Sequence, residues 1–212
     1  MENIINRIIE GIDIEGVEMN IRVKIPKRDK KVTDYKYEKE YESTEEFNRR
    51  NVELGRYRYY IAYGSNMNLG QMGYRCPDSR FYSLGYIEGY RLEFRDKYSN
   101  IKVNRDSQVP AVVYRISDRD EKILDEYEKD YEKKEIRVRL TGKEFDNSSI
   151  TGLIYIMKKT KRDRDNKEIK RLIRLPNRNY FEIIRKSYEF YGFDKEKLTD
   201  SLIHSFNIYY KL

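Results

Sequence analysis

The chain has 212 residues, of which 38% are hydrophobic and 38% charged, and its net charge is +7. This length suffices for one ordinary domain plus an extension, or for two small domains. The single cysteine and single histidine exclude a disulfide within the chain and a zinc site of the usual Cys/His type. Acidic residues are interspersed among the basic ones, so the composition favours a solvated mixed-charge surface over a nucleic-acid-binding arm.

Tyrosine dominates the aromatic residues, with 21 Tyr and 8 Phe against no Trp. Tyrosine must therefore do much of the packing, with each buried hydroxyl reaching a partner or the surface. The N-terminus lacks the basic start and long apolar core of a signal peptide. No apolar run approaches the length that spans a membrane. We therefore expect a soluble, cytoplasmic protein without a membrane partner.

Residues 1–56 differ from the rest and are predicted to be an accessory extension of a domain at 57–212. Isoleucines recur at helical spacing near the start of the extension, which predicts a short amphipathic helix. Alternating patterns over 17–25 and 32–41 predict a β-hairpin. The simplest interpretation is a stabilising extension, and the alternative is an arm that selects a partner or substrate.

From Tyr57 onward, strand and helix patterns are mixed. The predicted strands are Tyr57–Tyr63, two strands within Arg80–Arg95 with bends or bulges at Gly85 and Gly89, Ala111–Ile116, Tyr131–Leu140 and Ile150–Met157. The predicted helices run from a Ser117 cap to about Glu128, from about Arg178 to Tyr191 with a stop at Gly192, and from about Asp194 to Ile208. This order predicts an α+β fold whose sheet is strongly curved or closed into a small mixed β-barrel with flanking helices.

An apolar aromatic run over Tyr60–Tyr63 ends abruptly in Gly64, Ser65 and Asn66. This is the pattern of a buried strand that delivers a tight loop to an edge of the fold. Gly64 allows either a close approach of the backbone to another group or a positive φ, and Ser65 and Asn66 add short polar side chains. Successive backbone N–H groups in such a turn form a pocket for a carboxylate or a developing oxyanion.

A second candidate is Glu128, at the end of the helix that Ser117 begins. Leu124, Tyr127 and Tyr131 fall at helical spacings and mark the predicted inward face, with Glu128 at its edge. Burial beside tyrosines would raise the pKa of this carboxyl group, because burial disfavours the charged form. A carboxyl group tuned in this way can accept and return a proton. The alternative is that Glu128 is one acid in an acid-rich segment.

Four blocks of sequence, in order over roughly 57–198, resemble the γ-glutamylcyclotransferase (AIG2-like) family. They are Tyr60–Asn66 with Gln71-Met72 and Arg75–Pro77, Phe81–Phe94 with its two glycines, Val112–Ser117 leading to Glu128, and Asn179–Ile184 with Gly192. Any single block is a weak signal, and four in register are specific. The resemblance implies a γ-glutamylcyclotransferase-like fold.

The resemblance also implies an activity, in which a γ-glutamyl amide is cyclised to 5-oxoproline and its amine or amino acid is released. The partner is then a small molecule, and neither a metal nor a cofactor is implied. Glu128 would be the general acid/base, and the turn Tyr63–Asn66 (Tyr63, Gly64, Ser65 and Asn66) would hold the γ-glutamyl group. Tyr60, Tyr131 and Tyr180 would line the pocket. The Tyr-Gly-Ser-Asn form of the turn resembles the branch that acts on γ-glutamyl amino acids.

Two positions depart from the family pattern. Lys129 stands where members usually have glycine, and Ala111 where a glycine is common. A cation at Lys129 would favour the charged carboxylate and oppose the rise in the Glu128 pKa. Lys129 and the unmatched extension motivate an alternative function, a non-catalytic small-ligand-binding or protein-interaction module on the same fold. A third reading, a tyrosine-rich nucleic-acid binder, is disfavoured by the interspersed acids.

Overall fold

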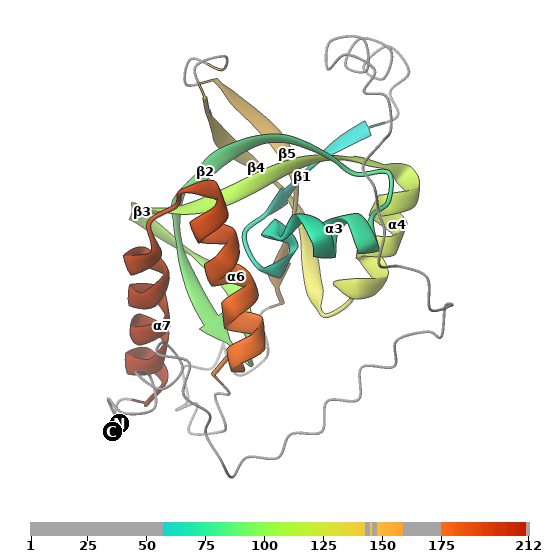
Figure 1. Cartoon of the computed structure of the whole chain (residues 1–212). Helices are drawn as coiled ribbons and strands as arrows, with labels where there is room; N and C mark the ends of the chain where they lie inside the picture. Colours follow the sequence, from blue (N-terminus) through green and yellow to red (C-terminus); the bar gives the residue numbers. More distant parts are fainter. Residues whose placement is uncertain (1–56, 143–144, 146–147, 159–174, 211–212) are drawn as a thin grey trace.

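Five strands close into a barrel in the order β1-β3-β2-β4-β5, with helices packed on its outside (Figure 1). The computed structural model describes residues 57–142, 145, 148–158 and 175–210. The strands are β1 (Tyr57–Ala62), β2 (Arg80–Arg95), β3 (Tyr98–Ser117), β4 (Tyr131–Thr141) and β5 (Ser149–Met157). The helices are η1 (Ser65–Met67, a 3-10 turn), α3 (Leu69–Arg75), α4 (Asp118–Tyr127), α6 (Arg178–Tyr191) and α7 (Lys195–Tyr210). The predicted α+β fold with a small closed barrel is confirmed.

The predicted extension, including its helix and hairpin, lies outside the described residues. Among the helices that the structure describes, none is both long and apolar enough to cross a membrane.

The barrel closes along β1, which pairs with β3 on one side and β5 on the other. Pairing with β3 is antiparallel and continuous, from Tyr57 opposite Ser117 to Ala62 opposite Val112. Pairing with β5 is parallel, and its register is a single pair, Tyr60 opposite Leu153. The residue that closes the barrel therefore lies on the same strand that leads, through Ile61 and Ala62, into the turn that the sequence singled out.

Strands β2 and β3 form one long hairpin, which corrects two predictions. Arg80–Arg95 is a single strand rather than two, and β3 begins at Tyr98 rather than at Ala111. The early half of β3 was missed because its residues are mostly polar, including the buried Ser99 and Asn100, so it lacks the apolar–polar alternation typical of a half-buried strand. Gly89 does mark a bulge, because its φ is +76° and the register shifts there. Gly85, by contrast, stays in register.

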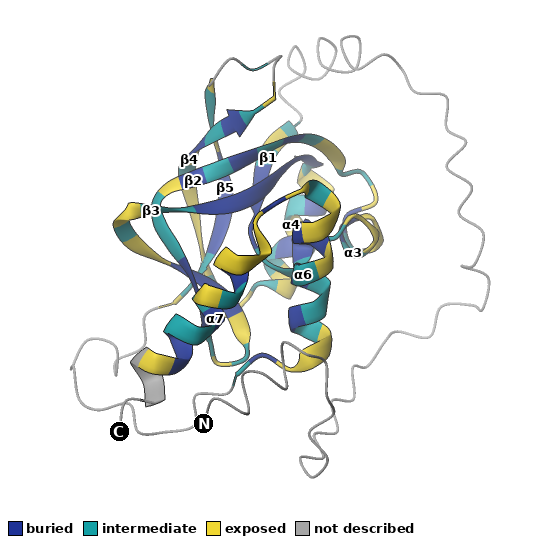
Figure 2. Cartoon of the chain, turned by 60° about the vertical axis from the view of Figure 1, so that its left-hand side comes forward, coloured by how far each residue is buried: buried dark blue, intermediate teal, exposed yellow. Residues whose placement is uncertain are grey.

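The core lies inside the barrel and beneath α6 and α7. Buried residues run along the strands, without interruption from Val109 to Ile116 of β3, whereas α6 and α7 each alternate between buried and exposed residues (Figure 2). Phe181 of α6 packs on Phe94 of β2 with ring centroids 5.7 Å apart, and the Phe94 N–H donates to Ser205 Oγ of α7 at 2.8 Å. Each such side chain contributes about 1.5–3 kcal/mol through burial. These contacts fix the helices against the hairpin.

Helix α4 begins and ends where the sequence predicts. The Ser117 side chain accepts a hydrogen bond from the Asp120 N–H, and Glu128 is the residue that follows the last turn. Leu124 is fully buried as predicted, but Tyr127 is 50% exposed, so its assignment to the inward face was wrong. The helix ends at Tyr127, and the Tyr127 ring contacts the Arg75 guanidinium instead of the core.

We expect Asp120→Asn to stabilise the protein at pH 7 by about 1 kcal/mol, because asparagine keeps the shape of the buried side chain but removes the charge that burial disfavours. Asp120 is fully buried; its Oδ1 accepts from the Asp78 N–H at 3.3 Å, and its Oδ2 has no partner among the described residues. Burial raises the Asp120 pKa, and the Asp78 carboxylate also raises it. Folding therefore favours the neutral acid, and this preference adds to the free energy of unfolding below the unfolded pKa of about 3.9. The added free energy is lost as pH rises through the folded pKa of Asp120.

The measurement is chemical denaturation of both proteins between pH 4 and pH 7. The advantage of Asp120→Asn should grow as pH rises, because asparagine does not titrate. Asp118→Asn, an exposed change in the same helical turn, is the control and should show no such growth. If Asp120→Asn were less stable than wild type at pH 7, the charge of the buried Asp120 carboxylate would not be the destabilising feature.

Candidate active site

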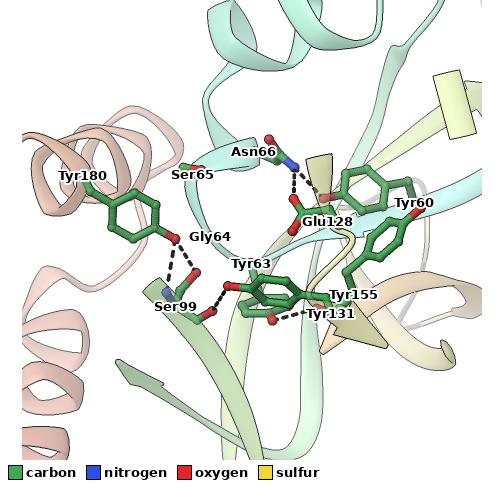
Figure 3. A pocket seen from close by; sticks show the side chains of 10 residues that line it. All are labelled: Tyr60, Tyr63, Gly64, Ser65, Asn66, Ser99, Glu128, Tyr131, Tyr155 and Tyr180. Atoms are coloured by element: carbon green, nitrogen blue, oxygen red, sulfur yellow. Dashed lines mark hydrogen bonds between the residues drawn. The ribbon is translucent and has the colours of Figure 1, made fainter. Parts of the chain in front are cut away.

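A cavity of about 40 Å³ opens beside the end of β1 (Figure 3). It is lined by Tyr60, Tyr63, Gly64, Ser65, Asn66, Ser99, Glu128, Tyr131, Tyr155 and Tyr180. All eight site residues that the sequence predicted are therefore brought together, although they come from β1, the turn that follows it, η1, β4, α6 and the end of α4. Ser99 and Tyr155 were missed, because neither belongs to a motif and each reaches the cavity only through the folding of β3 and β5.

Of the two alternatives that the sequence allowed for Gly64, the structure shows the close approach of the backbone. Its φ is −118°, so it is not in the left-handed region. A Cβ on Gly64 would overlap Ser99 Oγ and lie 3.4 Å from the Tyr180 hydroxyl oxygen. The Ser99 hydroxyl in turn hydrogen-bonds the Tyr180 hydroxyl at 2.8 Å. The turn after β1 can therefore pack onto β3 and α6 only because residue 64 has no side chain.

Asn66 is at the centre of a hydrogen-bond network and is buried. Its Nδ2 donates to the Tyr60 hydroxyl at 2.8 Å and to Glu128 Oε1 at 3.2 Å. Its Oδ1 accepts from Gln71 Nε2 at 3.1 Å and from the Arg75 guanidinium at 2.7 Å. These four bonds use both donors and both lone pairs of the amide. The orientation of Asn66 is thus determined by its partners.

Glu128 presents its carboxyl group to the cavity, on the opposite side from Gly64 (Figure 3). Burial raises the pKa of this group, while the Arg75 charge and the hydrogen bond from Asn66 lower it. The cation that opposes the rise is Arg75 of α3 rather than Lys129, whose side chain is exposed. A carboxyl group with these opposing influences can hold a proton and release it during one reaction.

The tyrosines around the cavity are neutral hydroxyl groups. Burial raises the pKa of Tyr60, Tyr63, Tyr131 and Tyr180. The Tyr63 hydroxyl donates to the backbone oxygen of Tyr155 at 2.7 Å, so this side chain braces β5. The Tyr60 hydroxyl accepts from Asn66, which leaves its own proton available to a ligand. The cavity therefore combines one carboxyl group with uncharged hydrogen-bonding groups.

The chemistry of this lining suits a small polar organic molecule better than a metal ion. In the described ranges, no group of three or more His, Cys, Asp or Glu side chains is arranged to hold a metal. His204 lies on α7 and Cys76 follows α3, and neither lines the cavity.

Comparison with known proteins identifies similar sequences and folds. The family model described as gamma-glutamyl cyclotransferase, AIG2-like, matches residues 60–175. A solved structure named gamma-glutamyl cyclotransferase is 20% identical with a TM-score of 0.56, over 69% of this chain and 86% of that one. The uncharacterized protein loc79017 from Homo sapiens is 20% identical with a TM-score of 0.57, over 70% and 87%.

A further similar structure is YkqA from Bacillus subtilis, 16% identical with a TM-score of 0.54, over 74% of this chain and 58% of that one. At these identities the structural neighbours show a shared fold. No curated protein matches the chain.

Proposed function

Because the chain belongs to the gamma-glutamyl cyclotransferase, AIG2-like family, we propose that it cyclises a γ-glutamyl amide to 5-oxoproline, with Glu128 as the general acid/base. The observation that carries the proposal is the cavity itself, in which the Glu128 carboxyl group and the Gly64 turn line the same small space. The substrate class is γ-glutamyl amino acids or γ-glutamyl amines. Residues 57–212 form the catalytic domain in this proposal, and residues 1–56 are accessory.

The reaction needs no nucleophile from the protein. The α-amine nitrogen of the substrate attacks its own side-chain carbonyl carbon, and a ring C–N bond forms as the carbonyl oxygen becomes an oxyanion. Glu128 accepts the proton that the attacking amine loses. It then donates a proton to the leaving nitrogen, the original amide C–N bond breaks, and 5-oxoproline and the free amine separate. Glu128 ends in its initial state, so protons balance over the cycle.

The remaining residues act by position. The first backbone N–H groups of a helical turn have no partner within the turn, so those at the start of η1 are suited to stabilise the oxyanion. Hydroxyl groups of Tyr60, Tyr131 and Tyr180 are suited to hold the substrate folded back on itself. Holding an intramolecular nucleophile in place supplies a large part of such a rate enhancement.

The test is to incubate the full chain with γ-glutamyl amino acids and γ-glutamyl amines and to measure 5-oxoproline by mass spectrometry. We expect product only from substrates with a free α-amine. The α-glutamyl isomers, which lack the γ-amide, and N-acetylated γ-glutamyl compounds, whose nucleophile is blocked, are the matched controls. Product from the N-acetylated compounds, or none from any γ-glutamyl compound, would refute the proposed reaction.

The alternative is a non-catalytic ligand-binding or protein-interaction module on the same fold. It is motivated by Lys129, which replaces the usual glycine beside Glu128. Calorimetry distinguishes the two functions, because a binding module would give saturable heats with γ-glutamyl compounds and no 5-oxoproline.

A further inference from the structure

Arg75 does not line the cavity, but it contacts Asn66, the side chain that bonds Glu128. Its NH1 group donates to Asn66 Oδ1 at 2.7 Å, and Asn66 Nδ2 donates to Glu128 Oε1 at 3.2 Å. A rotated Asn66 amide would point its NH2 group at the guanidinium and its oxygen at the carboxylate, and both contacts would be repulsive. The Arg75 contact therefore aims the Asn66 donor at Glu128.

Arg75 is itself held from two sides. Its guanidinium carbon lies 4.6 Å from the centroid of the Tyr127 ring, a cation–π contact at the last residue of α4. Its own helix is anchored by buried Met72, and the Asn68 side chain caps the start of that helix. Since Glu128 follows Tyr127 directly, Arg75 reaches Glu128 by two routes, through Asn66 and through the end of α4.

The second route matters because the last turn of α4 carries no basic residue of its own. The carboxyl end of a helix bears partial negative charge, which a cation there stabilises. That partial charge lies next to the Glu128 carboxylate and disfavours its ionised form. The cation that offsets it comes from α3 instead of α4.

We propose that Arg75 is a positioning residue for the reaction proposed above, which orients Glu128 through Asn66 and adjusts its basicity from outside the cavity. Gln71 assists by donating to both Asn66 Oδ1 at 3.1 Å and Ser65 Oγ at 2.8 Å. One Glu128 oxygen is then fixed by Asn66, and the other is left to exchange protons with substrate.

The groups that face Glu128 give the sign of the expected pH effect. The interacting ionisable side chains are Arg75 of α3, Tyr60 and Tyr63 at the end of β1, Tyr131 of β4 and Tyr180 of α6. The tyrosines are neutral near pH 7, so Arg75 is the charged member of this set. Its charge lowers the Glu128 pKa, and its removal must raise it.

The test measures Glu128 directly by NMR titration of the full chain with 13C-carboxyl-labelled glutamate, with the signal assigned by its loss in Glu128→Gln. Arg75→Met should move the Glu128 titration upward by about one pH unit, the scale expected for a nearby opposite charge. The acidic limb of the kcat/KM profile should move by the same amount. Arg119→Met, which removes an exposed cation paired with Asp78, is the control and should leave both unchanged.

Arg75→Lys separates position from charge and guards against a methionine variant that does not fold. The lysine keeps the charge but lacks the planar fork that bonds Asn66 and stacks on Tyr127. We expect about a tenfold loss of kcat with little movement of the acidic limb.

The proposal is overturned if Glu128 titrates at the same pH in Arg75→Met as in Arg119→Met, or if Arg75→Lys retains the kcat of wild type. Because the NMR titration needs no turnover, it decides the role of Arg75 even if wild type releases no 5-oxoproline. In that case the proposed function alone would fail.

Discussion

Glu128→Gln is expected to lower kcat for 5-oxoproline formation by about 1,000-fold, within the usual range for loss of a general acid/base. The substitution keeps the size of the side chain, and the glutamine oxygen can still accept from Asn66 Nδ2 as Glu128 Oε1 does at 3.2 Å. It removes the ability to take up and return a proton, together with the negative charge of the ionised carboxylate. Substrate affinity should therefore change much less than kcat, and initial rates across a range of substrate concentrations will separate the two.

The matched control is Glu126→Gln, the same chemical change on an exposed residue of the same helix. We expect this control to retain wild-type kcat, and both variants to match wild type in circular dichroism and melting temperature. If Glu128→Gln kept its activity, Glu128 would have no part in proton transfer.

Gly64→Ala is expected to reduce kcat/KM by about 100-fold, the scale of a misplacement near 1 Å in a site that works by orientation. The added Cβ would overlap Ser99 Oγ, so the turn must move away from β3 or Ser99 must give up its bond to Tyr180. Either response disturbs the cavity on the side opposite Glu128. Overpacking of this kind should also lower the free energy of unfolding by about 1–3 kcal/mol.

Two comparisons test the cause. Gly70→Ala is the control, because Gly70 is exposed on α3 and its added Cβ would meet only Asn68 Oδ1, at 3.3 Å. In Gly64→Ala combined with Ser99→Ala, the overlapping oxygen is gone and the next nearest atoms are 3.4 Å away, so stability should be partly restored. If the double variant is as unstable as the sum of the single changes, steric overlap is not the cause.

The part of the fold that was predictable from sequence is the part that local signals determine. Ser117 begins α4 because its side chain caps the helix, and Gly192 ends α6 in the left-handed region at φ +71°. Both signals act within one turn of the chain. The first half of β3 carries no such local signal, because its pairing with β2, rather than its own composition, makes it a strand.

The candidate site shows the same division. Glu128 and the turn at Gly64 were found as motifs, and the cavity brings them together. Ser99 lines that cavity only because the β2–β3 hairpin extends beyond its apolar half. The cation that acts on Glu128 was assigned to its sequence neighbour Lys129, whereas the structure supplies Arg75 from another helix. Charge interactions depend on distance through space, which no spacing along the chain reports.

The single parallel pair between Tyr60 and Leu153 has a consequence for how the cavity comes into being. These residues are far apart in the chain, so we expect the contact to form late, after the intervening strands have shortened the loop that it closes. The Tyr60 hydroxyl also accepts a hydrogen bond from Asn66 Nδ2. The pairing that closes the cylinder also brings together Tyr60 of β1 and Tyr155 of β5, which both line the cavity. We therefore expect a partly folded chain with an open seam to lack a formed place for substrate.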